Sequence, residues 1–144
     1  MLMQPSFHHR EVSTPMNLIL IPVAPGELID KITILKIKSE RMDDPEKLAN
    51  VRRELELLRR EQSRHIPDDP TVAEMEARLE EVNGRIWDLE DVIRDCDRQK
   101  DFGEVFLDTA RKIYRTNDER AAIKKQINLH LGSQIVEEKS YAEY

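Results

Sequence analysis

The sequence predicts an all-α fold, an antiparallel bundle of four helices with short β-type runs near both ends of the chain. Apolar residues recur at alternating three- and four-residue spacings, the period of helices with one buried face. Asp44-Pro45 and Asp69-Pro70 break this pattern where one helix stops and the next is capped. Charged residues make up 36% of the chain and aromatic residues 5%, a mixture typical of long, solvent-exposed helices.

The chain has 144 residues, which suits one domain with one core. We expect residues 17–144 to form this domain and residues 1–16 to be a disordered leader, with Met16 as a candidate start. Residues 17–24, NLILIPVA, are a short β-type run. Pro22 rules out a central strand but allows an edge strand, because proline has no amide hydrogen to donate.

The first two helices are expected to form a short hairpin, over residues 25–42 and from Pro45 to near His65. Pro25 suits the opening turn of the first helix. Apolar residues cover most of its circumference, which predicts the most buried helix of the four. The second helix has Asp44 as its N-cap and a clean apolar spacing at Leu48, Val51, Leu55 and Leu58.

The third and fourth helices are expected to form a longer hairpin, because each is about 30 residues and hence about 45 Å long. We expect the short hairpin to lie against this long one. The third helix begins after Asp69, and Gly84 within it is expected to allow close approach of another helix. Its unbroken heptad seam is typical of an antiparallel bundle or coiled coil, and consists of Met75, Leu79, Val82, Ile86, Leu89 and Ile93.

The fourth helix is expected to start at a capping box made by Asp101 and Glu104 and to run to Leu131, before Gly132. A second β-type run follows over residues 134–136. The two β-type runs are expected to pair with each other or across a dimer.

The fourth helix also carries an unusual polar stripe. Its first half places Phe102, Phe106 and Ile113 on one face, but the same face then continues with polar groups. They are Asn117, Arg120, Lys124 and Asn128. Burying unpaired charge is costly, so these groups need protein partners, a ligand or open solvent.

Other helices offer partners for this stripe. Lys31 lies beside the apolar arc of the first helix, with Glu27 and Asp30 nearby. On the third helix, a polar stripe with a tryptophan runs next to the heptad seam and indicates a pocket wall. The candidate ligand-binding residues are therefore Lys31, Asn83, Trp87, Glu90, Asn117, Arg120, Lys124 and Asn128. The structural alternative is that the stripe faces solvent or sets the register between helices.

Several classes of function are disfavoured. The net charge is −6, and acids interrupt every basic cluster, so we expect no nucleic-acid partner. The longest apolar run, Leu18 to Ile21, is too short to cross a membrane. The single cysteine indicates a reducing compartment, and we expect a cytoplasmic protein. No catalytic motif or metal-ligand spacing is present, so no metal and no cofactor are predicted, and enzymatic activity stays open.

Five segments resemble an uncharacterised bacterial family, domain of unknown function 6165. They are PVAPGELIDKITILKIK at 22–38, LANVRRELELL at 48–58, VNGRIWDLEDVIR at 82–94, ARKIYRTNDERAAIKKQIN at 110–128 and GSQIVEEKSY at 132–141. The resemblance covers nearly everything after Met16. It implies a small bacterial cytoplasmic protein and supplies no activity. The first helix is also weakly similar to the opening helix of all-helical chorismate mutases, but the later basic residues and the long hairpin do not fit that fold.

Two functions follow from these patterns. The first is a small helical module that self-associates, as a homodimer, or docks an unidentified protein partner. The second is a small enzyme or sensor that binds a small anionic ligand through the Lys/Arg/Asn stripe. The first predicts that the stripe is exposed or lies in a protein interface, and the second predicts a concave pocket where its cations meet.

Overall fold

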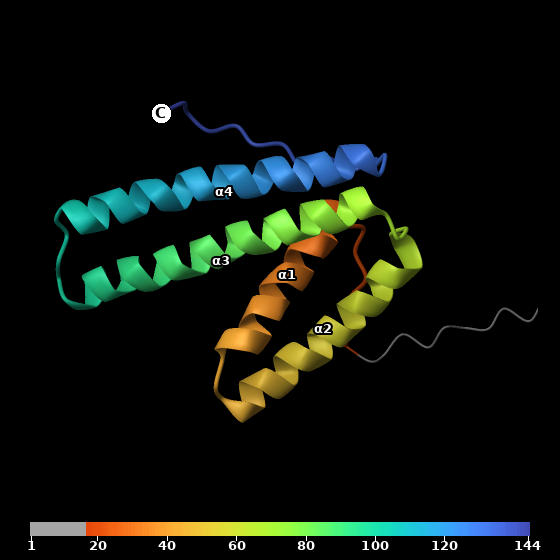
Figure 1. Cartoon of the computed structure of the whole chain (residues 1–144), viewed down its shortest axis with the longest axis horizontal. Coiled ribbons are helices and arrows are strands. Elements are labelled where there is room, and N and C mark those ends of the chain that lie inside the picture. Colours follow the sequence, from red (N-terminus) through yellow and green to blue (C-terminus); the bar gives the residue numbers. More distant parts are fainter. Residues whose placement is uncertain (1–16) are drawn as a thin grey trace, which may run out of the picture.

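The computed structural model describes residues 17–144, which form four helices (Figure 1). These are α1 (Pro25–Arg41), α2 (Pro45–His65), α3 (Pro70–Arg98) and α4 (Glu104–His130). The all-α fold class is confirmed, and the expected helix bounds agree with the observed ones to within a few residues. The predicted leader over residues 1–16 lies outside the described residues.

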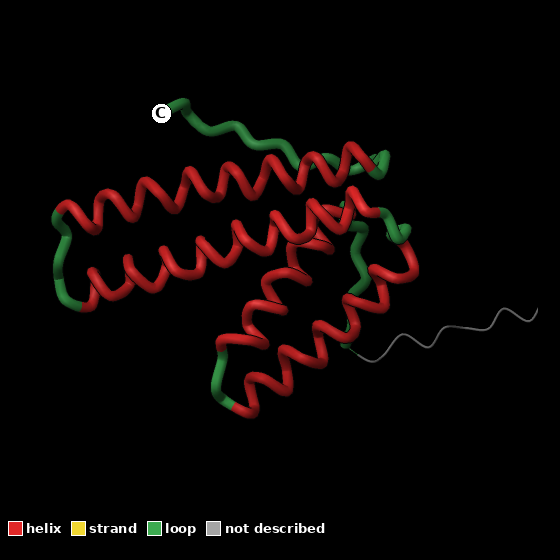
Figure 2. Tube along the Cα trace, in the orientation of Figure 1, coloured by secondary structure: helices red, strands yellow, loops and turns green. Residues whose placement is uncertain are grey.

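The two β-type runs form no strand, and no other strand occurs among residues 17–144 (Figure 2). Outside the helices, no backbone–backbone hydrogen bond involves residues 17–23. Residues 131–144 turn and then run as an irregular segment. A lone pair of four-residue strands is marginal in water, which is why strand propensity alone does not produce a ladder here.

The helices begin for different local reasons. The side chain of Asp44 accepts a hydrogen bond from the Glu46 amide at 3.0 Å, and Asp69 accepts one from the Thr71 amide at 2.8 Å. Both are the N-caps expected from sequence. The expected capping box at the start of α4 is wrong, because the N-cap residue is Gly103 and Asp101 accepts from the Gly103 amide instead. This Asp-x-Gly turn competes with the box for the same carboxylate.

Helices α3 and α4 form a long antiparallel hairpin (Figure 1). Its register is marked by two contacts, since Arg78 donates to Gln126 at 3.3 Å and Arg85 pairs with Glu119 at 2.6 Å. Helix α1 packs against both of these helices. At the backbone level α2 packs against α1 alone, and it reaches α3 through side chains such as the Arg59–Glu76 ion pair at 3.0 Å. Helix α2 therefore flanks the other three, and Val51 is its one buried residue.

The hydrophobic core occupies one half of the α3–α4 hairpin, where α1 covers it. Ile29 of α1 contacts a cluster of residues from the other two helices. The cluster consists of Val72, Met75, Leu79 and Val82 from α3, and Ile123 and Ile127 from α4. We call this half, residues 70–88 and 116–130, the base of the hairpin.

The other half projects past α1 as two helices and the loop that joins them (Figure 1). We call this half, residues 89–115, the arm. No hydrogen bond or ion pair joins the arm to residues 17–66. Cys96 and Thr109 are its two buried residues, and Cys96 is unpaired. The arm thus continues the heptad seam without a third helix to cover it.

Candidate functional site: a polar network between α1, α3 and α4

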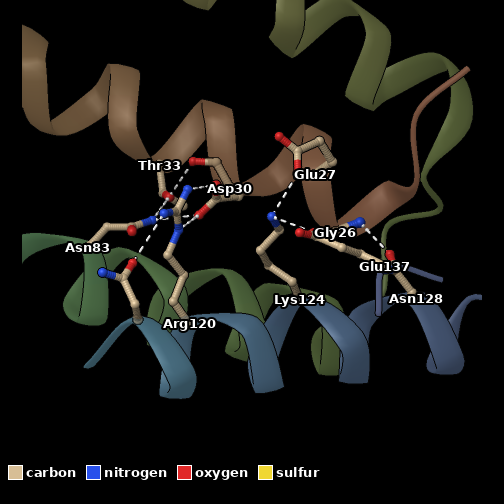
Figure 3. A network of polar contacts seen from close by, with 10 residues as sticks. Gly26, Glu27, Asp30, Thr33, Asn83, Arg120, Lys124, Asn128 and Glu137 are labelled. Atoms are coloured by element: carbon tan, nitrogen blue, oxygen red, sulfur yellow. Dashed lines mark hydrogen bonds and ion pairs between the residues drawn. The ribbon is translucent and has the colours of Figure 1, made fainter. Parts of the chain in front are cut away.

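The centre of the network is a buried carboxylate on α1. Asp30 is 1% exposed, and it faces α4 from among the buried residues of α1. Arg120 of α4 donates to both of its oxygens, from Nε to Oδ1 at 2.9 Å and from Nη2 to Oδ2 (Figure 3). This two-point geometry suits the planar guanidinium and aligns α1 with α4.

Helix α3 completes this centre through Asn83. Its Nδ2 donates to Asp30 Oδ1 at 2.9 Å and lies 2.9 Å from Thr33 Oγ1 (Figure 3). The Thr33 hydroxyl donates to the Asp30 carbonyl at 2.8 Å, which leaves its oxygen free to accept. Three helices therefore meet on one carboxylate. The hydrogen bond and the charge of Asp30 raise the pKa of Arg120, despite the opposing effect of burial.

A second ion cluster lies one helical turn further along α4. The Lys124 side chain is 12% exposed, and its Nζ donates to Glu27 at 2.7 Å and to Glu137 at 3.2 Å. Burial lowers the pKa of Lys124, but the bonds and charges of the surrounding carboxylates outweigh it, so the net shift is upward. Glu137 belongs to the segment that follows α4, and the cluster ties that segment to α1.

Asn128 caps α1 from another helix. The N-cap residue of α1 is Ala24, whose side chain makes no capping bond. Asn128 Oδ1 instead accepts from the Gly26 amide at 2.7 Å (Figure 3), which satisfies one of the free amides that every helix start leaves. A Cβ on Gly26 would lie 2.5 Å from the Lys124 carbonyl oxygen, so only glycine allows this approach.

The expected role of Gly84 is wrong, because helix packing does not require a glycine there. A Cβ on Gly84 would meet nothing nearer than the Arg41 guanidinium, at 3.8 Å. That is an ordinary van der Waals distance. The close contact between helices lies at Gly26, which sequence reasoning read only as part of a helix start.

Four of the candidate ligand-binding residues line one groove. Asn83, Trp87, Glu90 and Arg120 surround a volume of about 330 Å³ where α1 diverges from α3. The Arg41 guanidinium lies 5.9 Å from the centre of the Trp87 ring, within the range of a cation–π contact. The predicted pocket wall on α3 therefore lines a real groove.

The other candidates lie elsewhere. Lys124 and Asn128 line a smaller recess of 190 Å³ beside the segment that leads into α1. Asn117 accepts a long bond of 3.5 Å from Arg120, and it also lines a cavity between α4 and residues 139–144. Lys31 is exposed, and no hydrogen bond or ion pair among residues 17–144 includes it. The three cations therefore do not converge, because α1 turns Glu27 and Asp30, not Lys31, toward α4.

Gly26, Thr33 and Glu137 are network residues that sequence reasoning missed. Spacing predicts Glu27 and Asp30 as neighbours of the stripe, and in the structure they are its partners. One signal was available, since Glu27, Asp30 and Thr33 recur at three-residue spacing within the most apolar helix. A polar row of this kind on a buried helix predicts a matching row on the helix packed against it.

The network is saturated by its own members. Among residues 17–144, no buried side-chain nitrogen or oxygen lacks a hydrogen-bond partner. Each of the two cations is bound to at least one carboxylate. Within the same residues, no group of three or more His, Cys, Asp or Glu side chains is placed to hold a metal ion. Through these hydrogen bonds and ion pairs, the network joins α1, α3, α4 and the segment after α4.

The fold and the network define a class of protein, a small all-α protein whose interior charges link its helices. The chain belongs to the family described as "Family of unknown function (DUF6165)", whose model matches residues 19–144. This confirms the family resemblance found in the sequence. No curated protein and no solved structure matched the chain. Among the described helices, none combines the length and the apolar character that a membrane crossing requires.

Proposed function

We propose that this chain is a non-catalytic assembly module that self-associates through its arm. The observation that carries the proposal is the contrast between the two halves of the α3–α4 hairpin. In the base, the heptad seam is buried under α1. In the arm, the same seam has no cover on the side that α1 occupies in the base.

The uncovered surface, which we call the open face, has a defined composition. It consists of Ile93, Phe106, Ala110 and Ile113, all of them only partly buried. Residues 139–144 flank it at Ile113. At 100° per residue, the α4 members lie within about 60° of one another and continue the face that carries Arg120 and Lys124 in the base. A pair of helices rarely exposes an apolar face of this kind to water, because burying the apolar face supplies most of the stability of packed helices.

Two hairpins that share such a face form a four-helix bundle, the usual solution for antiparallel helix pairs. A closed dimer with two-fold symmetry is the commonest way for one surface to satisfy itself. The buried, unpaired Cys96 supports the further proposal of a reducing, cytoplasmic setting. The coiled-coil spacing of the arm supports packing along its whole length.

The alternative function, a sensor or enzyme for an anionic ligand, receives less support. An anion site needs cations that are free to bind it, but Arg120 and Lys124 are already bound to carboxylates. Lys31 lies apart from both. We therefore favour the structural interpretation of the polar stripe, in which it sets the register of α1 on α4.

The first prediction tests the open face by a single substitution. Ile93→Glu places a charge at the centre of this face, where a partner helix would desolvate it. Sedimentation velocity over a wide concentration range should show a dimer for the parent and a monomer for the variant. Helix content by circular dichroism should be unchanged, because glutamate is a good helix former.

The matched control is Val92→Glu. Val92 precedes Ile93 on α3, is 42% exposed and lies about 100° around the helix, away from the open face. This variant should remain a dimer. A parent that sediments as a monomer at every concentration would refute the proposed function, and equal dimerisation of both variants would move the interface off the open face.

A further inference from the structure

We infer that the cavity between α4 and residues 139–144 binds a small organic cation whose charge lies on an alkylated ammonium group. The observation that carries the inference is that all three tyrosines of the chain, Tyr114, Tyr141 and Tyr144, line this one cavity. The inference goes beyond the proposed function, because the residues that line the cavity belong to one copy of the chain.

The segment after α4 brings two of the tyrosines to the third. Residues 131–144 turn back along α4 (Figure 1), and the Tyr144 hydroxyl donates to Asp118 at 3.0 Å. The Tyr144 and Tyr114 rings lie 5.1 Å apart, centre to centre, with 58° between their planes. No backbone–backbone hydrogen bond holds residues 134–144, so side chains alone attach this segment to α4. A segment held in this way opens at little cost and can admit a ligand.

The cavity has the size and the lining of a small-molecule site. Its volume is about 770 Å³, within the range of roughly 300–1,000 Å³ that is typical of ligand pockets. Ile113 adds an apolar wall to the three tyrosines, and Asn117, Asp118 and Glu143 add a few polar groups. The tyrosines are 41–79% exposed, so a ligand can reach their rings. Aromatic walls with a few polar groups are the usual composition of such a site.

The charges and the rings of the lining favour a cation. Two acids and one basic residue leave the lining with a net charge of −1. The chain's own cations already lie over two of the rings, since Arg115 is 5.4 Å from the centre of the Tyr144 ring and Lys139 Nζ is 5.7 Å from that of Tyr141. Lys139 is exposed, and an exposed contact of this kind is weak, so a ligand cation can displace it.

An alkylated ammonium group suits this lining better than other cations do. Alkyl groups replace the hydrogens that a primary amine would donate, so the charge is best received by ring faces. They also carry apolar surface, which Ile113 and the tyrosines can bury. A hard metal ion would need six or more oxygen ligands, whereas the lining brings two carboxylates.

Choline is the probe for this site, and its control is the neutral alcohol in which carbon replaces the choline nitrogen. The two molecules share one shape and differ in charge. We would titrate each into the full chain by calorimetry and follow the methyl protons of choline by NMR. Choline should bind on the order of tenfold more tightly than the alcohol, because the rings attract its charge. Its methyl resonance should move upfield, since the face of an aromatic ring shields nearby protons.

Substitutions at Tyr114 separate the ring from the rest of the site. Tyr114→Phe keeps the ring and should bind choline as the parent does, whereas Tyr114→Leu should bind it on the order of tenfold more weakly. Asp118→Asn removes a charge but keeps an acceptor for the Tyr144 hydroxyl, so it should weaken the binding of choline and not of the alcohol. Ile93→Glu changes the open face and not the lining, and should leave the binding of choline unchanged.

Three results would overturn the site. The parent chain could fail to bind choline, or it could bind choline and the neutral alcohol equally, which would make the cavity a general apolar groove. A Tyr114→Leu protein that binds choline as tightly as the parent would place the binding elsewhere. Sedimentation velocity tests self-association separately, so a parent that is monomeric throughout and binds choline would refute the proposed function and uphold the site.

Discussion

At the scale of single residues, Asp30 is the clearest case of a buried charge that depends on its neighbours for solvation. A carboxylate at 1% exposure loses nearly all of its hydration, and this costs several kcal/mol unless other groups replace the water. Arg120 and Asn83 supply that replacement. Pairs of this kind add little net stability compared with apolar residues, but removing one partner is strongly destabilising.

The Arg120→Met variant tests this directly. It leaves the Asp30 carboxylate buried without a counter-charge, and should lower the free energy of unfolding by about 3–5 kcal/mol in urea titrations. Arg85→Met is the control, because the Arg85–Glu119 pair is exposed and should be worth less than about 1 kcal/mol. Adding Asp30→Asn to Arg120→Met should recover part of the loss. An Arg120→Met protein as stable as the parent would contradict this account.

Lys124 predicts a dependence on alkaline pH. Its pKa is raised above 10.5 in the folded protein, so folding favours the protonated form. The stabilisation is complete below pH 10.5 and is lost as the pH rises through the higher folded value. The difference in unfolding free energy between the parent and Lys124→Met should therefore shrink at alkaline pH. A difference that stays constant from neutral to strongly alkaline pH would show that Lys124 acts through packing alone.

At the scale of elements, the helix starts divide into two kinds. Helices α2 and α3 are capped by the aspartate that precedes them, so local sequence determines where they begin. Helix α1 is capped by Asn128, 102 residues further along the chain. Its first turn therefore depends on how α4 packs against it, and Gly26 is the residue that permits this packing.

Two glycine substitutions separate local propensity from packing. Gly26→Ala should destabilise the fold by about 1–3 kcal/mol, because the new methyl group would overlap the Lys124 carbonyl. Gly84→Ala should stabilise it by about 1 kcal/mol, because α3 has room there and alanine is the better helix former. Thermal unfolding of the two variants beside the parent checks both signs. If the two changes shifted the stability equally, the α1–α4 contact would be able to move apart to accept a methyl group at Gly26.

At the scale of the whole molecule, the base and the arm show what a sequence pattern can predict. The heptad seam from Met75 to Ile93 runs unchanged through both halves. It identified the inner face of α3 correctly, because periodicity reports which side of a helix is apolar. It did not show where α1 stops covering that face, because α1 covers it through long-range contacts that leave no local signal.

Some features of the candidate site could likewise be predicted from sequence, and others could not. Periodicity located the polar stripe on α4 and the groove wall on α3, since both depend on spacing within one helix. It misplaced Lys31 and overlooked Gly26, since their roles depend on how α1 is rotated against α4. That rotation brings together Asp30 and Arg120, which lie 90 positions apart in the chain.

The cap that Asn128 provides to Gly26 also has a consequence in time. During synthesis the chain grows from its amino end at about 5–20 residues per second, so Asn128 is added about 5–20 s after Gly26. For most of this interval α1 lacks the guanidinium of Arg120 that neutralises Asp30, and until its end α1 lacks the cap. The first turn of α1 is therefore incompletely stabilised during synthesis. We expect α1 to finish docking on α4 only when α4 is complete. Synonymous codons that slow translation between these two positions would lengthen the period in which an aliphatic helix is open to chaperones.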